Sequence, residues 1–142
     1  MNEKIMKIAF KESKKANKIN EIPVGAVIIK NEKIISKGYN MKEKYNDPTM
    51  HAEIIAIRKA CKKLKDWRLD DCTLFVTMEP CEMCLNVILE CRIKNIVCGI
   101  KNKKNNKIND LIKKGKINVV YGVYSKEIIE ELNAFFQKIR EK

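Results

Sequence analysis

Short apolar runs alternate with amphipathic segments along most of the chain, and this alternation restricts the possible folds more than any other feature. From apolar runs, strands are predicted at 24–29, 33–39, 73–77, 95–98 and 117–121. From apolar residues at helical spacing, helices are predicted at 3–17, 51–63, 81–91, 109–114 and along a stripe from Ile128 to Ile139. The first two strands, with Asn31-Glu32 between them, form a hairpin, and helices separate the later strands. The sequence therefore predicts a three-layer α/β/α fold around a central five-stranded mixed, largely parallel sheet.

The length of 142 residues suits one domain, 1–142, with a single modest core. Hydrophobic residues make up 45% of the chain, and their regular runs argue against disorder although 34% of residues are charged. No apolar stretch approaches the roughly 20 residues of a membrane span, and charges interrupt residues 1–15 too often for a signal peptide. We therefore expect a cytoplasmic protein with no membrane partner.

Basic residues outnumber acidic ones by 30 to 18, which gives a net charge of +12. Clustered Lys and Arg side chains bind phosphates, so a nucleic-acid partner is one interpretation. Seven lysines fall within 101–116, where Asp110 is the one acidic residue. A solvated surface explains the same run equally well, and the charge alone leaves both interpretations open.

Two short motifs supply metal-ligating residues at the starts of two predicted helices. The first is His51-Ala52-Glu53, which contains the single histidine of the chain, and the second is PCEMC at 80–84. Cys81 and Cys84 share a helix face, and a helix N-terminus favours their thiolate forms. One imidazole and two thiolates leave a fourth zinc position open for water, which is typical of a catalytic site. The other four cysteines lie in or beside apolar segments and are expected to be buried.

Glu53 follows the histidine by two residues and is the candidate proton carrier of this site. A carboxylate beside activated water can take up a proton and deliver it to a substrate. The competing interpretation of Cys81 and Cys84 is a redox pair, which would leave the HAE motif without a role.

The chain resembles the bacterial tRNA adenosine deaminases of the zinc-dependent cytidine/deoxycytidylate deaminase superfamily. The resemblance covers roughly residues 3–99 through EIPVGAV at 21–27, GYN at 38–40, DPT at 47–49, HAEI at 51–54, WRL at 67–69, TLFVT at 73–77, EPCEMC at 79–84 and CRI at 91–93. Residues 132–140 resemble the last helix of that family. The chain departs from the family at Leu85-Asn86-Val87 and at 100–106, where the family has small residues and an Arg-Asp pair, respectively.

This resemblance implies a cytidine-deaminase-like fold and the hydrolytic deamination of adenosine to inosine at the wobble position of a tRNA anticodon. The partners it implies are a tRNA anticodon stem-loop and a second copy of the chain, as a homodimer with one Zn²⁺ per subunit. By position, the resemblance assigns zinc to His51, Cys81 and Cys84, and acid–base catalysis to Glu53. It assigns a hydrogen bond with the target nucleoside to Asn40. The pocket lining that it implies comes from the backbones of Ala52, Glu79 and Pro80.

Candidate RNA contacts lie in the two C-terminal segments that border this site in the family. They are Lys101, Asn102, Lys103, Lys104, Phe136 and Arg140. Phe135 and Phe136 are equally explained as the buried stripe of an amphipathic helix.

Two other functions remain open on the sequence. A deaminase of a free base or nucleoside, of guanine or cytosine type, would use the same zinc chemistry. A zinc-stabilised RNA-binding module would use the metal for folding alone, although the intact Glu53 and the open zinc position argue against it.

Overall fold

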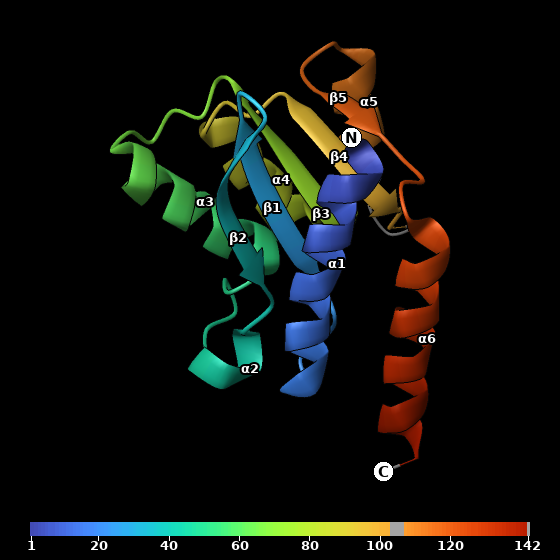
Figure 1. Cartoon of the computed structure of the whole chain (residues 1–142). Coiled ribbons are helices and arrows are strands. Elements are labelled where there is room, and N and C mark those ends of the chain that lie inside the picture. Colours follow the sequence, from blue (N-terminus) through green and yellow to red (C-terminus); the bar gives the residue numbers. More distant parts are fainter. Residues whose placement is uncertain (103–106, 142) are drawn as a thin grey trace.

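The computed structural model describes residues 1–102 and 107–141 and has the expected three layers (Figure 1). Its five-stranded sheet has the order β2-β1-β3-β4-β5. The strands are β1 (Gly25–Lys30), β2 (Lys33–Tyr39), β3 (Cys72–Met78), β4 (Asn95–Ile100) and β5 (Asn118–Val120). β1 pairs antiparallel with both β2 and β3, whereas β3–β4 and β4–β5 are parallel. The sheet is mixed as predicted, with its parallel part confined to the three strands that helices connect.

The hairpin turn lies where the sequence predicts it, at Asn31 and Glu32. Both residues adopt the left-handed conformation, with φ of 51° and 65°. Two such residues between paired strands match the right-handed twist of a hairpin, and Lys30 pairs directly with Lys33. The turn sets the register of the first two pairs, and an irregularity between Ile28 and Ile29 shifts it by one residue before Gly38 and Tyr39 pair with Ala26 and Gly25.

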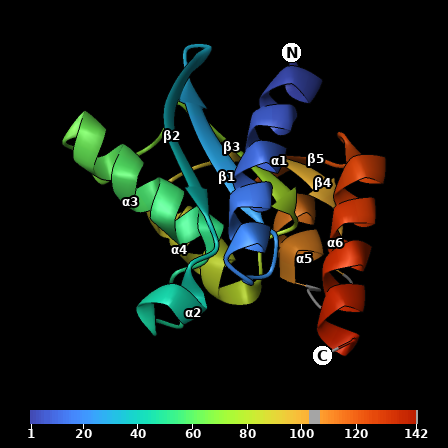
Figure 2. The ribbon, with the colours of Figure 1, turned by 60° about the horizontal axis from the view of Figure 1, so that its bottom comes forward.

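Helices cover both faces of the sheet (Figures 1 and 2). One face carries α1 (Asn2–Lys18) and α6 (Ser125–Arg140), and the other carries α3 (Ala52–Leu64), α4 (Glu82–Glu90) and α5 (Lys107–Lys113). The larger core lies between the sheet and the α3–α4–α5 layer, and the smaller core lies under α1 and the start of α6. This arrangement brings the starts of α3 and α4 together at one end of the molecule.

Close packing of β2 against α3 positions the start of that helix. A Cβ atom on Gly38 would lie 2.6 Å from the carbonyl oxygen of Ala52, so no side chain fits there. One turn further along, the buried Ser36 hydroxyl donates a hydrogen bond to the carbonyl oxygen of Ala56 at 2.7 Å. The first two turns of α3 are therefore held directly against the strand.

One helix was not expected from the sequence. The segment before the Asn46-Asp47 turn forms the four-residue helix α2 (Lys42–Tyr45), which ends at Asn46 in the left-handed conformation. Four residues give too short a pattern for helical periodicity, so only the turn that follows was predicted. Among the remaining elements, the ends differ from the predicted ones by up to two residues, except that α6 begins three residues before its apolar stripe.

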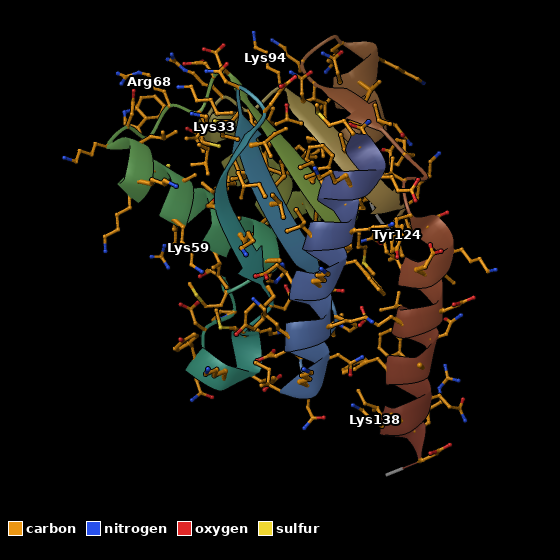
Figure 3. All side chains as sticks on the ribbon, in the orientation of Figure 1. Lys33, Lys59, Arg68, Lys94, Tyr124 and Lys138 are labelled. Carbon is orange, nitrogen blue, oxygen red and sulfur yellow. The ribbon has the colours of Figure 1, made fainter. Side chains whose placement is uncertain are left out.

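The outer surface is rich in lysine on several sides. In Figure 3, Lys33, Lys94 and Arg68 lie toward one end of the molecule, Lys59 beside α3 and Lys138 on α6. The positive charge of the described residues is therefore spread over the surface. No helix in the described ranges has both the length and the hydropathy required to cross a membrane.

Candidate active site and metal centre

The histidine lies at the mouth of α3, directly before its first residue. The Asp47 carboxylate accepts hydrogen bonds from the backbone N–H of Thr49 at 2.8 Å and from its hydroxyl at 2.7 Å, which lowers the pKa of Asp47. The backbone N–H of His51 in turn donates to the carbonyl oxygen of Thr49 at 2.8 Å. This tight turn aims the imidazole out of the helix mouth, as the DPT sequence predicts.

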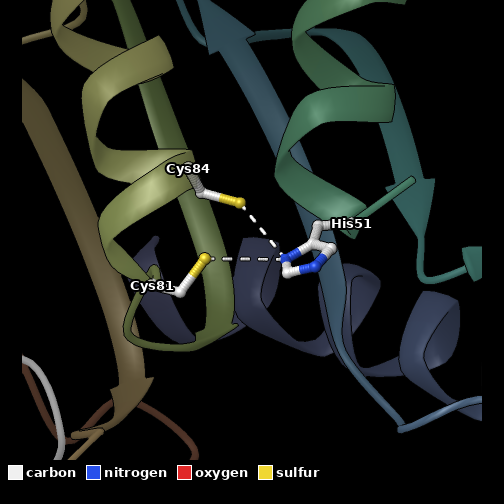
Figure 4. Close-up of side chains that lie close together, drawn as sticks. All are labelled: His51, Cys81 and Cys84. Carbon is white, nitrogen blue, oxygen red and sulfur yellow. Dashed lines mark hydrogen bonds between the residues drawn. The ribbon is translucent and has the colours of Figure 1, made fainter. Parts of the chain in front are cut away.

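The two cysteines lie at the mouth of α4, opposite the histidine (Figure 4). Cys81 has an extended backbone and precedes the helix, and Cys84 lies in the first turn with no exposed surface. The free N–H groups of a helix start favour negative charge, and here two helix starts meet. The dipoles of both helices therefore favour negative charge at the site.

The three side chains form a set of metal-ligating atoms. His51 Nδ1 lies 3.7 Å from the sulfur of Cys81 and 3.4 Å from that of Cys84 (Figure 4). All three ligand atoms lie within 4.8 Å of one another. In a tetrahedral zinc site, bonds of about 2.3 Å to sulfur and 2.1 Å to nitrogen place these atoms about 3.6 Å apart. The site therefore fits zinc, and it is the one such group among residues 1–102 and 107–141.

The protonation states of the two thiols differ. The Cys84 thiol donates to the sulfur of Cys81, which together with the bond to His51 lowers the pKa of Cys81 to about 4. The same contact raises the pKa of Cys84, and the contact with Cys81 raises the pKa of His51. Binding of a cation through both sulfurs therefore requires the Cys84 thiol to lose its proton.

Glu53 is buried beside these residues, with 4% of its surface exposed. Burial, which disfavours the charged form, raises its pKa to about 7. A carboxyl group that titrates near neutral pH can both accept and donate a proton during turnover. Glu53 therefore has the chemical property that its predicted role requires.

Asn40 joins two parts of the site through its side-chain amide. Its Nδ2 donates to the carbonyl oxygen of Ile22 at 3.0 Å, and its Oδ1 accepts from the backbone N–H of Ala52 at 2.8 Å. These partners fix the orientation of the amide and leave one N–H of Nδ2 for a further acceptor. They also occupy the backbone donor of Ala52, whose side chain is fully buried.

Two hollows meet at His51. The smaller, here called the metal cavity, has a volume of about 160 Å³ and is lined by Ile22, Val24, Asn40, His51, Glu53, Met78, Glu79, Cys81 and Asn102. The larger, here called the wide cleft, has a volume of about 370 Å³ and is lined by Asn20, Glu21, Ile22, Asn40, Lys42, Glu43, His51, Phe135, Phe136 and Ile139. The metal cavity contains the candidate chemistry, and the wide cleft leads from it to α6.

Two of the four predicted pocket residues line the metal cavity. These are Asn40 and Glu79, whereas Ala52 and Pro80 are buried and line neither hollow. Among residues that sequence reasoning missed, Met78 lines the metal cavity and Ile22 lines both hollows. Ile22 belongs to the EIPVGAV segment, so the family resemblance was a signal that could have identified it.

The predicted RNA contacts are distributed unevenly around the two hollows. Asn102 lines the metal cavity, and Phe136, which is 39% exposed, lines the wide cleft. Lys101 lies with its Nζ 4.9 Å from the centre of the Tyr121 ring, and Arg140 is exposed in the last turn of α6 outside both hollows. Lys103 and Lys104 fall outside the described residues. Phe135 is only 2% exposed, which agrees with its alternative interpretation as a core residue.

Comparisons with known proteins agree with this site. The family model for the cytidine and deoxycytidylate deaminase zinc-binding region matches residues 1–100. The tRNA-specific adenosine deaminase of Haemophilus influenzae is 40% identical over 149 residues, which cover 99% of this chain and 86% of that protein. The corresponding protein of Bacillus subtilis is 38% identical and covers 99% of this chain and 92% of its own length.

Solved structures give the same family. A tRNA:A34 deaminase studied for A-to-I editing at the wobble position of transfer RNA superposes with a TM-score of 0.81 at 32% identity, covering 88% of this chain and 96% of its own. Guanine deaminase from Bacillus subtilis superposes with a TM-score of 0.66 at 38% identity, covering 77% and 72%. The chain therefore belongs to the cytidine and deoxycytidylate deaminase zinc-binding family, among its tRNA-specific adenosine deaminases.

Proposed function

We propose that this protein converts adenosine to inosine by hydrolytic deamination at the wobble position of a tRNA anticodon. The similarity of almost the whole chain to tRNA-specific adenosine deaminases carries this proposal, with 40% identity over 99% of its length. That length includes α6 and the residues of the wide cleft. A basic chain with a net charge of +12 also suits a polyanionic substrate.

Each proposed catalytic role follows from position and charge. Zinc held by His51, Cys81 and Cys84 would supply the Lewis acidity that activates water at neutral pH. Glu53 takes one proton from water and passes it to a ring nitrogen of adenine, while the water oxygen bonds to the carbon that carries the amino group. Glu53 then takes the second proton from that oxygen and passes it to the amino group, whose bond to carbon breaks to release ammonia. Its pKa of about 7 lets the same carboxyl group perform both transfers.

The metal cavity and the wide cleft suit two parts of one RNA substrate. The cavity accepts a single extruded base, and the remaining N–H of Asn40 is a donor for that nucleoside. The wide cleft offers Phe136 and Ile139 as apolar surface for a neighbouring nucleotide. We assign Lys101, Asn102 and Arg140 to contacts with the surrounding stem-loop, where lysine and arginine bind phosphates without reading bases.

A product assay with several substrates tests this function. The zinc-loaded protein is incubated with an anticodon stem-loop carrying a wobble adenosine and, separately, with adenosine, cytidine, cytosine and guanine. We expect inosine from the stem-loop and no product from the free compounds. The Glu53→Ala variant should keep one zinc per chain and lose about 10²–10⁴-fold in kcat, because only the proton carrier is removed. Retained turnover by this variant would exclude Glu53 from the mechanism.

A deaminase of a free purine is the second candidate. The 38% identity to guanine deaminase from Bacillus subtilis favours it, and the metal cavity alone holds a base. Xanthine formed from guanine, with no inosine from the stem-loop, would select this candidate. A zinc-stabilised RNA-binding module would bind the stem-loop and form neither product.

The homodimer remains a proposal that rests on family resemblance. A chain of 16.5 kDa that pairs with itself should sediment at about twice that mass. Sedimentation at the monomer mass over the concentration range of the activity assay would exclude it. The cytoplasmic location is likewise proposed, in keeping with a tRNA substrate.

A further inference from the structure

Glu21 is a buried carboxylate to which the catalytic chemistry gives no role. Only 3% of its surface is exposed, although it lies in the wall of the wide cleft. Its Oε1 accepts a hydrogen bond from the backbone N–H of Glu43 at 3.1 Å, and its Oε2 accepts one from that of Lys44 at 2.8 Å. These donors lie in the first turn of α2 and have no partner within that helix. Both oxygens of Glu21 thus hold the backbone of α2.

Ile22, the residue after Glu21, makes a second contact with the site. The carbonyl oxygen of Ile22 accepts from Asn40 Nδ2, while Asn40 Oδ1 accepts from the N–H of Ala52. The dipeptide 21–22 therefore contacts the segment 40–52 at its first residue, Asn40, and again at residues 43–44.

Two backbone hydrogen bonds close the segment 40–52 into a loop, so a movement of α2 would be transmitted to both ends of that loop. The N–H of Met41 donates to the carbonyl oxygen of Met50 at 3.0 Å, and the N–H of Asp47 donates to that of Lys42 at 3.1 Å. Met41 and Met50 are buried together with Ile55 in a small cluster of their own. A shift of α2 would consequently move Asn40 and His51, which lie at the two ends of this loop.

We infer that Glu21 is a positioning residue for deamination, and this inference rests on the proposed function. It acts through α2, whose N–H groups it holds, to fix the loop that presents Asn40 to the substrate and His51 to the metal. A carboxylate in the wall of an RNA-binding cleft would repel phosphates if it were free. Here its charge is bound by two backbone donors.

Hydrogen exchange tests the contact independently of activity. The variants are Glu21→Gln, which keeps one acceptor oxygen, and Glu21→Ala, which keeps none. The control is Glu12→Gln, which alters another buried glutamate, one that pairs with Lys15 at 2.7 Å within α1. We expect the amides of Glu43, Lys44 and Ala52 to exchange about tenfold faster in Glu21→Gln and faster still in Glu21→Ala. In the control they should exchange at the wild-type rate.

Steady-state kinetics with the anticodon stem-loop test the consequence. We expect kcat/KM to fall about tenfold in Glu21→Gln and about a hundredfold in Glu21→Ala, chiefly through KM, with one zinc per chain retained. Unchanged amide exchange, or unchanged kcat/KM in Glu21→Gln, would overturn the inference. If Glu21→Ala does not fold, the amide exchange and the kcat/KM value of Glu21→Gln alone test the inference.

Failure of the proposed function has a different signature. If the wild-type protein deaminates a free base only, the stem-loop assignment fails, and the same loss of kcat/KM on that base still supports a positioning role. If the wild-type protein deaminates none of the substrates, the hydrogen exchange of the Ala52 amide alone tests whether Glu21 positions the loop. Faster exchange there in Glu21→Gln supports the link from α2 to α3, and unchanged exchange overturns it.

Discussion

The mouth of α3 and the helix α6 border the same wide cleft, but they are held in place by different means. Seven of the thirteen residues of α3 are buried, and Gly38 and Ser36 lie directly against its first two turns. Of the sixteen residues of α6, only Ile128 and Phe135 are buried. Polar contacts at its surface add to these, including a 2.6 Å hydrogen bond from Ser13 to Glu131.

This difference matches the proposed division of the cleft between chemistry and RNA recognition. Acid–base and metal chemistry tolerate little displacement, so they require the densely packed side of the cleft. Side chains on a helix with few buried residues can still bind a nucleic-acid loop. Substitutions on the two sides should therefore have different kinetic signatures.

The largest effect is expected from Cys84→Ala. This change removes a fully buried metal ligand and leaves only His51 and Cys81, so zinc and activity should be lost together and stability should decrease. Metal analysis and thermal unfolding with and without added zinc measure both losses. Normal zinc content would show that the ligand assignment is wrong.

The next effect is a pH dependence of stability in the metal-free protein. Burial raises the pKa of Glu53 to about 7 from an ordinary value of 4.5, so the folded state holds a proton that the unfolded state releases between these pH values. The free energy of unfolding should accordingly fall from pH 4.5 to 7 by about 3 kcal/mol more in the wild type than in Glu53→Gln. Denaturant titrations across this range give the difference. Parallel profiles for the two proteins would contradict the burial of a titrating carboxyl group.

A smaller and purely kinetic effect is expected on the α6 side. Phe136→Ala removes an exposed ring from the wide cleft, and loss of one stacked base should raise KM for the stem-loop by about tenfold. The kcat value and the zinc content should stay at wild-type levels. Ile129→Ala is the matched control, because Ile129 is a similarly exposed residue of α6 outside the cleft. Equal effects of both variants would remove the stacking role.

The smallest effect is expected from Lys138→Ala. Its Nζ donates to the side chain of Asn17 at 3.1 Å across an exposed gap between α6 and α1. Solvent competes for such a bond, so the free energy of unfolding should change by less than about 0.5 kcal/mol. A larger loss, measured by denaturant unfolding, would show that surface contacts hold α6 and would weaken the contrast between the two sides.

The sequence predicted the parts of the site that local patterns encode. The HAE and PCEMC motifs each begin a helix, and the strand–helix alternation brings those beginnings together. The turn before His51 was also predictable, because its Asp47-Pro48-Thr49 chemistry acts within three residues. The five strands and the hairpin follow from the same kind of local pattern.

Features that depend on distant partners were not predictable. The helix α2 is only four residues long and is capped by Glu21, about twenty residues earlier in the chain. The raised pKa of Glu53 depends on burial by the complete fold. Phe135 and Phe136 are adjacent and chemically identical and both line the wide cleft, and only the packing of α6 decides that Phe135 is buried and Phe136 is exposed.

The three metal-ligating residues lie on two helix starts, so a bound ion would cross-link two distant parts of the chain. His51 and Cys81 are thirty residues apart, and the chain between them includes all of α3 and β3. An ion held by these ligands binds the folded chain and not the unfolded one, so it would stabilise the fold by its binding free energy. Loss of zinc would therefore lower the resistance of the protein to unfolding together with its catalytic activity.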